Sequence, residues 1–206
     1  MIRFEFFFDC SSPWTYLAFV NVQPIAAEFG VDIEWKPILV GGIFNAVNDS
    51  VYRNRENPVP AKARYSRKDL YDWARVAGIE INWPTIFPIN SVKAMRGCLV
   101  AAGDGRLVPF ASRVFHAYWG ENRDINDDAV LADIVAETGL DRTRFFDGIA
   151  RQDIKDRLKA NTQDVIDRGG FGSPTMFVND TDMYFGNDRL PLVRAAFERL
   201  RRSSRA

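Results

Sequence analysis

The N-terminal part of the chain alternates between two hydrophobic patterns. Residues 2–8 (IRFEFFF) form a continuous aromatic and β-branched run, which predicts a strand buried on both faces. Residues 13–29 then place apolar side chains at helical spacing, and Gly30 follows as a typical C-terminal stop. Residues 31–38 alternate apolar and polar positions, which is the period of a half-buried strand. The pattern therefore predicts a β-α-β unit, a parallel pair of strands joined by a crossover helix.

The middle of the chain changes to helical patterns. Residues 41–60 are rich in Gly, Asn, Arg and Pro and predict a loop. Helical spacing without convincing strands then recurs in residues 61–79, 91–103, 106–119, 127–138 and 141–168. Two short strands, 175–178 and 183–185, follow around a turn, and a final helix is expected from about Asp188 to Arg201.

This order of elements predicts an α/β protein with a thioredoxin-like sheet, βαβ…αββα, and a large all-helical insertion. We expect a discontinuous thioredoxin-like domain made of residues 1–40 and 165–206. Residues 41–164 would form the helical insertion domain between its two parts. The sequence contains no internal repeat or low-complexity linker that divides the chain further.

Composition and charge narrow the class of protein. The chain has 206 residues, 47% of them hydrophobic and 13% aromatic, which is enough for a core and excludes intrinsic disorder. Its 27 basic and 27 acidic residues balance, so we expect no nucleic-acid partner. Charges at Arg3, Glu5 and Asp9 interrupt any signal-peptide core, and no apolar run reaches bilayer length. We therefore expect a cytoplasmic protein without a membrane partner.

The scarce residue types exclude several kinds of site. His116 is the single histidine, so no site with two histidine ligands can form. Its aromatic neighbours favour a helix histidine without chemistry. Cys10 and Cys98 lie far apart in the sequence and form neither a CxxC pair nor a zinc ribbon. We expect no metal site.

Ser12 and Pro13 mark the start of the first helix. Ser is a preferred N-cap and Pro is favoured at the first helical position, and capping alone is a sufficient reason for this pair. Because a buried strand ends just before Ser12, the serine is also expected at the carboxyl edge of the sheet, where α/β folds bind ligands. Its hydroxyl would lie beside the positive end of the helix, where an anion such as a thiolate is stabilised.

Two further segments are candidates for ligand contacts. Ser173-Pro174 precedes a strand, and a cis bond there would turn the backbone N–H and C=O of Ser173 toward a ligand; an ordinary loop is the alternative. Asn187, Asp188 and Arg189 open the last helix. They either cap this helix or hold a zwitterion, with backbone N–H groups for a carboxylate and Asp188 for an ammonium group.

Four segments together carry a family resemblance. They are residues 8–17 (FDCSSPWTYL), 60–62 (PAK), 171–177 (FGSPTMF) and 185–190 (FGNDRL). In this order and spacing they resemble the kappa-class glutathione transferases and, within that superfamily, the 2-hydroxychromene-2-carboxylate isomerases. The resemblance covers essentially residues 2–200 and implies a DsbA-type thioredoxin domain with a helical insertion.

The resemblance assigns expected roles around the first helix. The redox branch of the superfamily carries Cys-Pro-x-Cys where this chain has Ser12-Pro13-Trp14-Thr15, so disulfide exchange has lost its nucleophile. By resemblance, Ser12 is the catalytic serine that hydrogen-bonds the sulfur of bound glutathione. Pro174 matches the cis-proline of the family, and the backbone of Ser173 would pair with the glutathione peptide.

The remaining glutathione contacts are also implied by the resemblance alone. Asn187 and Asp188 match positions that hold the γ-glutamyl end, with Arg189 beside them. Lys62 matches a lysine near the glycyl carboxylate. The loop over residues 54–57 departs from the pattern of many relatives, so which of its asparagines contributes stays open.

The reaction implied by this family is a glutathione-dependent cis–trans isomerisation. It interconverts 2-hydroxychromene-2-carboxylate and trans-o-hydroxybenzylidenepyruvate during aromatic-hydrocarbon degradation, by reversible thiolate addition that does not consume glutathione. Alternatives are a kappa-like transferase or peroxidase that acts on another electrophile, and a non-catalytic glutathione binder. Kappa-like relatives are dimers, so a homodimer is expected.

The second substrate, a small aromatic molecule, is expected between the two domains. Trp83, Phe87 and Trp119 are aromatic candidates for its contacts, with core packing as the alternative role of each. An arginine or lysine of the insertion would meet its pyruvate carboxylate.

Overall fold

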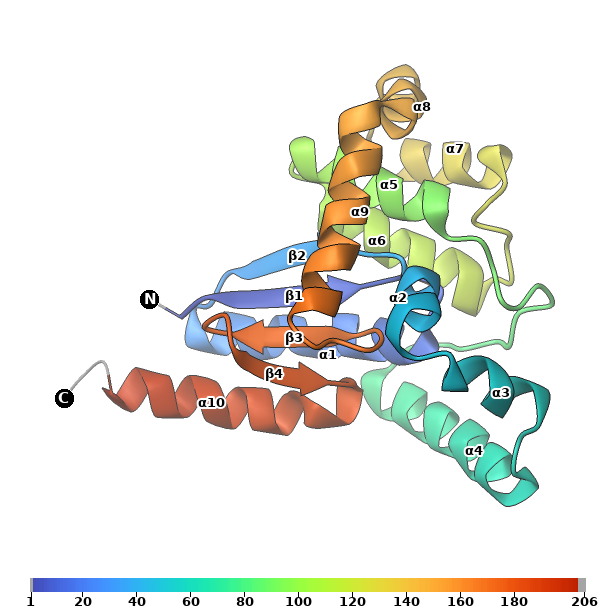
Figure 1. Ribbon diagram of the computed structural model, residues 1–206. Helices are drawn as coiled ribbons and strands as arrows, with labels where there is room; N and C mark the ends of the chain where they lie inside the picture. The colour runs from blue at the N-terminus through green and yellow to red at the C-terminus, as the bar shows by residue number, and fades with distance from the viewer. Residues whose placement is uncertain (1, 204–206) are drawn as a thin grey trace.

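A four-stranded mixed sheet forms the centre of the computed structural model, which describes residues 2–203 (Figure 1). The strands are β1 (Phe4–Phe8), β2 (Ile33–Pro37), β3 (Thr175–Val178) and β4 (Asp182–Phe185). They lie in the order β2-β1-β3-β4, with β1 parallel to β2 and antiparallel to β3. The predicted parallel pair in the N-terminal part of the chain is thereby confirmed.

Helices surround this sheet. Among the described residues the α-helices are α1 (Pro13–Phe29), α2 (Val40–Val47), α3 (Ser50–Glu56), α4 (Pro60–Ala77), α5 (Val92–Gly103), α6 (Leu107–Phe115), α7 (Asp128–Glu137), α8 (Arg142–Ala150), α9 (Gln152–Asp167) and α10 (Leu190–Ser203). A π-helical turn (His116–Gly120) extends α6, and a 3₁₀ turn (Asn187–Arg189) precedes α10. In Figure 1, helices α5 to α8 gather beyond the β2 edge of the sheet, whereas α10 runs beside β4.

Alternate side chains of β1 supply aromatic rings to both faces of the sheet. Phe4, Phe6 and Phe8 belong to the main core, where Phe6 and Phe8 both contact Phe19 of α1. Phe7 joins a smaller cluster with residues of α2, α9 and β3 on the other face. Every residue of β1 is buried, which confirms the prediction of a strand covered on both faces.

Helix α1 begins and ends where the sequence predicts. The Ser12 side chain accepts a hydrogen bond from the Thr15 backbone N–H at 3.2 Å, and Pro13 occupies the first helical position. Gly30 ends the helix in the left-handed conformation, with φ 65°, which glycine adopts at little cost. Because β1 ends at Phe8, four residues before Ser12, the start of α1 lies at the carboxyl edge of the sheet.

The prediction of a loop over residues 41–60 is wrong. Helices α2 and α3 occupy most of this segment. Val40 and Ile43 of α2 are buried, and Ile43 packs in the smaller cluster with Phe7 and Val165. This tertiary burial outweighs the glycine and asparagine residues that disfavour a helix in isolation.

Two predicted helices have different limits in the structure. The segment 141–168 holds two helices, because the backbone of Arg151 is extended, with φ −61° and ψ 143°, and separates α8 from α9. The last α-helix begins at Leu190 and reaches Ser203, after the 3₁₀ turn that contains the predicted start, Asp188.

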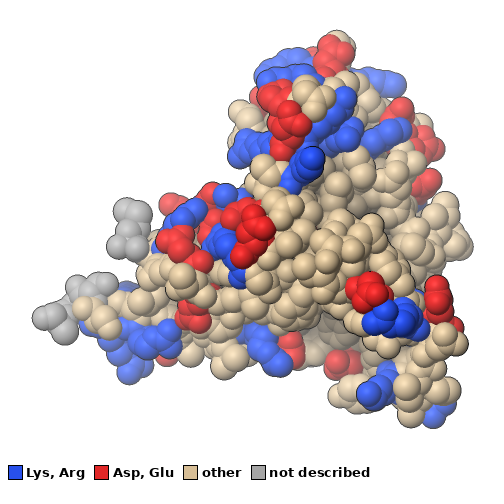
Figure 2. All heavy atoms as spheres, viewed as in Figure 1, with Lys and Arg blue, Asp and Glu red and all other residues tan. Residues whose placement is uncertain are grey.

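Charged side chains of both signs are interspersed over the face shown in Figure 2, around an uncharged area at its centre. His116 is 45% exposed, and its Nε2 atom lies 3.4 Å from the Glu121 carboxylate. Within residues 2–203, none of the helices is both long and apolar enough to cross a bilayer. Nor do these residues contain a group of three or more metal-binding side chains.

Candidate active site

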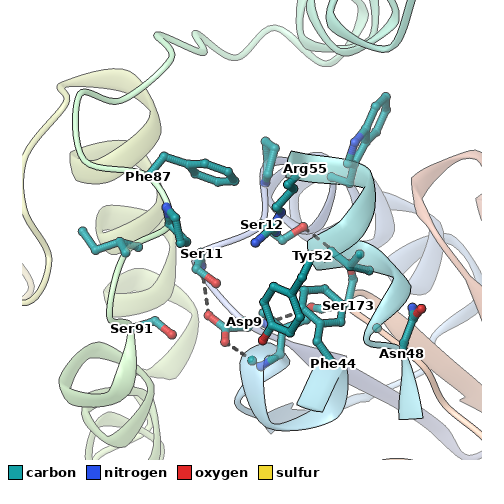
Figure 3. A pocket seen from close by; sticks show the side chains of 18 of the residues that line it. Asp9, Ser11, Ser12, Phe44, Asn48, Tyr52, Arg55, Phe87, Ser91 and Ser173 are labelled. Atoms are coloured by element: carbon teal, nitrogen blue, oxygen red, sulfur yellow. Dashed lines mark hydrogen bonds between the residues drawn. The ribbon is translucent and has the colours of Figure 1, made fainter. Parts of the chain in front are cut away.

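A cavity of about 1140 Å³ opens at the carboxyl ends of β1 and β2 (Figure 3). Its lining comes from the β1–α1 loop, from α2, α3 and α4, and from the loops that precede α5 and β3. The lining residues fall within the ranges 9–14, 39–58, 63–70, 83–92 and 171–173, together with Phe185. Segments far apart in the sequence therefore meet at the edge where the start of α1 lies.

Ser12 is a half-buried residue in this lining. One lone pair of its Oγ atom accepts the Thr15 N–H at 3.2 Å, as the N-cap prediction requires. Its only hydrogen is donated to the carbonyl oxygen of Ser173 across 3.4 Å, which is long for a hydroxyl donor. The hydroxyl hydrogen is therefore weakly held and can turn toward an anion in the cavity.

The Ser173-Pro174 peptide bond is cis, which is the alternative that the family resemblance implies. The Ser173 carbonyl faces Ser12, while the Ser173 Oγ atom accepts the Asp9 N–H at 3.0 Å and lies 2.8 Å from the Thr15 hydroxyl. Ser173 thus ties the end of β1, the first turn of α1 and the loop before β3 together. Among the described residues, no group accepts a hydrogen bond from its backbone N–H.

Asp9 is a functional candidate that the sequence analysis missed. Its carboxylate is 1% exposed and accepts two backbone hydrogen bonds, from Ser11 N–H at 2.9 Å and from Val40 N–H at 2.9 Å (Figure 3). Burial raises the pKa of Asp9, and hydrogen bonds from Ser11, Val40 and Ser91 oppose that rise. Through these hydrogen bonds, the carboxylate connects the start of α2 to the loop that contains Ser12. The sequence signal that could have identified Asp9 is its position, directly after a buried strand.

An aromatic wall borders the cavity. Trp83 and Phe87 line it, with ring centroids 4.9 Å apart. Trp119, the third aromatic candidate, is buried, and the centroid of its ring lies 5.9 Å from that of Trp83. Its Nε1 atom donates to the Cys10 carbonyl at 2.9 Å. Two of the three candidates therefore reach the cavity directly. The Phe87-Pro88 bond within this wall is also cis, which the sequence analysis did not predict.

Two arginines in the lining were also missed. The Arg55 guanidinium lies 5.6 Å from the ring centroid of Phe44 and 5.2 Å from that of Phe87. The Arg67 guanidinium lies 6.0 Å from the Trp83 ring. Arg55 lies in the segment that was predicted to be a loop, so its position could not be foreseen.

The other predicted ligand residues lie outside this lining. Asn187 is buried, and its Oδ1 atom accepts from the Asn21 side chain at 3.0 Å. Asp188 and Arg189 are exposed and pair with each other at 2.8 Å. Lys62 is exposed in the first turn of α4.

The asparagine that reaches the cavity from this part of the chain lies outside residues 54–57, where the sequence analysis expected one. Neither Asn54 nor Asn57 lines the cavity, whereas Asn48 does. The Asn48 side chain donates to the Phe171 carbonyl at 3.0 Å and so joins α2 to the loop before β3.

The site has no reactive thiol among the described residues. Cys10 and Cys98 are both buried and free. Burial raises the pKa of the Cys10 thiol, and a hydrogen bond with the Cys98 side chain raises it further. What the cavity offers is the hydroxyl of Ser12 at the positive end of α1, beside an aromatic wall and two cations.

Fold and site define a thioredoxin-fold protein in which hydroxyls replace both cysteines of the redox motif. The chain matches the DSBA-like thioredoxin domain family over residues 3–198, which confirms the predicted fold class. It is similar to the 2-hydroxychromene-2-carboxylate isomerase of Pseudomonas putida, with 31% identity over 97% of this chain and 96% of the relative. It is also similar to glutathione S-transferase kappa 1 of Homo sapiens, with 26% identity over 92% of this chain and 88% of the relative.

A solved structure of a 2-hydroxychromene-2-carboxylate isomerase extends the similarity to three dimensions. It superposes with a TM-score of 0.86 at 29% identity and covers 98% of this chain and 97% of that one. The chain therefore belongs to the DsbA-like thioredoxin family, and it is an enzyme of the branch that includes these isomerases.

Proposed function

We propose that the protein is a glutathione-dependent isomerase that interconverts 2-hydroxychromene-2-carboxylate and trans-o-hydroxybenzylidenepyruvate in aromatic-hydrocarbon degradation. The observation that carries this proposal is the hydroxyl of Ser12. Its oxygen caps α1, and its hydrogen is donated across a long distance, 3.4 Å from Ser12 Oγ to the Ser173 carbonyl oxygen. The names of the similar isomerases support the choice of substrate.

The residues at the start of α1 fit a thiol ligand. The weakly held hydrogen of Ser12 is available to a sulfur anion, and the N-terminus of α1 favours negative charge at the same place. Beside it, the backbone N–H of Ser173 is unpaired among the described residues and its carbonyl accepts only the long Ser12 contact. A peptide backbone can pair with both groups.

The chain itself has to stabilise a negative charge and to orient a planar substrate. Bound glutathione would supply a thiolate whose reversible addition turns a C=C bond into a single bond about which rotation is free. Ser12 donates to the sulfur, Asp9 holds the loop that carries Ser12, and Trp83 with Phe87 offers flat apolar surface to the substrate ring. No side chain of this set is consumed or changed in oxidation state.

A hydrogen bond from Ser12 is strong enough to ionise a thiol bound beside it at neutral pH. An unperturbed thiol has a pKa of about 8.5. One hydrogen bond to a charged group contributes roughly 1.5–3 kcal/mol, which lowers this pKa by about one to two units. A large fraction of a thiol bound there would then be ionised at neutral pH.

The test is an assay of the purified protein with 2-hydroxychromene-2-carboxylate and reduced glutathione, with chromatography of the products and titration of free thiol. We expect isomerisation that requires glutathione and leaves the amount of thiol unchanged. S-methylglutathione, which cannot form a thiolate, serves as the control and should not support turnover. Loss of thiol with formation of a conjugate would instead identify a transferase, and glutathione binding without any turnover would identify a non-catalytic binder.

A further inference from the structure

The side chain of Arg55 lies in the cavity and has no ion-pair partner in the described part of the chain. Its guanidinium lies between two rings in the cavity, 5.6 Å from the centroid of Phe44 and 5.2 Å from that of Phe87 (Figure 3). Arg53, two residues earlier on the same helix, pairs with Asp49 at 2.6 Å. Within residues 2–203, no carboxylate forms an ion pair with Arg55, so helix α3 directs one arginine to an acid and the other to the cavity.

The acid in the cavity lining does not neutralise this charge. Both carboxylate oxygens of Asp9 already accept backbone N–H groups, from Ser11 and Val40, each at 2.9 Å. The side chain is also 1% exposed and points away from solvent. Because Asp9 is buried and, among the ion pairs of residues 2–203, forms none with Arg55, the guanidinium of Arg55 has no anionic partner in the cavity lining.

The position of Arg55 leaves its hydrogen-bonding groups free. A guanidinium that stacks on aromatic rings uses its flat face, while its N–H groups at the edge stay available for the two oxygens of a carboxylate. Contacts with two rings also restrict the side chain, so less conformational entropy is lost when an anion binds. A planar aromatic acid could place its ring along the same wall that Phe87 and Trp83 form.

Arg55 is connected to the Ser12 side of the cavity through Phe44. Phe44, under Arg55, lies beside the loop before β3, because a Cβ atom at Gly172 would be 3.8 Å from its ring. The next residue in that loop is Ser173, whose carbonyl accepts from Ser12. The guanidinium of Arg67 instead lies over Trp83, a ring that is 43% exposed.

We propose that Arg55 binds the carboxylate of an aromatic acid whose ring lies against Phe87, and that it thereby determines the specificity of the site for anionic aromatic substrates. This inference rests on the proposed function and deepens it, because it names the residue that recognises the acid group. Arg67 is not assigned this role, because the single ring under it, that of Trp83, is 43% exposed.

A binding experiment tests the inference without turnover. Chromone-2-carboxylate is a stable planar acid, and chromone-2-carboxamide is its neutral counterpart. We would titrate each by calorimetry into the wild type and into the Arg55→Gln and Arg67→Gln variants. We expect Arg55→Gln to weaken binding of the acid about 10- to 100-fold, the loss of one hydrogen-bonded charge, and to change binding of the amide less than about twofold. Arg67→Gln is the matched control and should change neither by more than about twofold.

A kinetic experiment extends the test to the substrate. Arg55→Gln should raise KM for 2-hydroxychromene-2-carboxylate by a similar factor and leave the Kd of glutathione unchanged. Arg55→Lys should recover part of the loss, because lysine keeps the charge but lacks the planar fork. Arg55 is exposed and its side chain makes no hydrogen bond among the described residues, so the variants should unfold at the same urea concentration as the wild type.

Three results would overturn the inference. Equal losses for the acid and the amide would show that Arg55 only packs against the rings. A weaker affinity for glutathione with unchanged affinity for the aromatic acid would assign Arg55 to a glutathione carboxylate. A larger effect of Arg67→Gln would move the role to Arg67. By contrast, arginine-dependent binding of chromone-2-carboxylate in a protein without isomerase activity would refute the proposed function and support this inference.

Discussion

Replacement of Ser12 by alanine separates the structural role of the hydroxyl from its chemical role. The substitution removes the acceptor of the Thr15 N–H at 3.2 Å and the donor to the Ser173 carbonyl at 3.4 Å. Loss of the N-cap costs about 1 kcal/mol of stability. The longer contact adds little to this, so the melting temperature should fall by only about 2–4 °C.

The chemical effect of Ser12→Ala should be much larger than the structural one at neutral pH. Without the hydroxyl donor, the pKa of the bound thiol rises by about one to two units. If the wild-type complex titrates near pH 7, the thiolate fraction at that pH falls about 5- to 50-fold, and turnover falls with it. Above the raised pKa both proteins hold the thiolate, so the difference between their rates shrinks as the pH increases.

The assay is the pH dependence of kcat/KM for wild type and Ser12→Ala, together with the ultraviolet absorbance of the bound thiolate. Ser66→Ala is a matched control, because Ser66 lines the same cavity on α4 and its hydroxyl makes no hydrogen bond among the described residues. A loss in Ser12→Ala that is the same at every pH would show that the serine only shapes the loop. An unchanged profile would remove Ser12 from the mechanism.

Other substitutions and measurements test neighbouring parts of the site. Asp9→Asn places an amide donor against a backbone N–H and should lower stability by about 1–3 kcal/mol in urea unfolding. Because burial raises the pKa of Asp9, the native state keeps a proton that the unfolded state has lost. This group therefore lowers the stability of the wild type as the pH rises above about 3.9. The difference in stability between wild type and Asp9→Asn should then depend on pH, and a constant difference would contradict the raised pKa. Ser12→Cys puts a thiol at the N-terminus of α1, which should lower its pKa below about 8.5, measured by the pH dependence of alkylation; an ordinary pKa would argue against anion stabilisation there. A homodimer, expected from the family resemblance, should appear in light scattering, and a monomer at all concentrations would refute it.

The parts of the fold that were predicted correctly carry their signals locally. The buried strand β1 is visible as an unbroken run of aromatic residues, and α1 is bounded by Ser12, Pro13 and Gly30. Each of these residues acts through its own backbone or through a neighbour within one helical turn. The local sequence before β3 only allowed a cis bond at Pro174, because X-Pro bonds adopt that form readily, and the family resemblance was needed to favour it over an ordinary loop.

The missed parts depend on contacts between distant segments. Helix α2 is held by the burial of Ile43 against Phe7 and Val165, which a local composition of glycine and asparagine cannot reveal. Arg55 could not be assigned to the site while its segment was expected to be a loop. The role of Asp9 depends on Val40, which lies beyond the whole of α1 and β2. Sequence reasoning therefore found the start of α1 and two residues of the aromatic wall, and it missed the groups that α2 and α3 bring to the cavity.

The combination of these two parts explains how a redox scaffold can serve another chemistry. A helix N-terminus that lowers the pKa of a protein thiol lowers the pKa of any thiol placed at the same point, so the sulfur can arrive with a ligand. Hydroxyls at Ser12 and Thr15 keep the hydrogen bonds of that turn and remove the risk of a disulfide within the protein. A thiol that arrives with a ligand then needs a second substrate positioned next to its sulfur. In the proposed function, the aromatic wall with Arg55 would be the surface that holds this substrate, next to the turn where hydroxyls stand in place of the two cysteines.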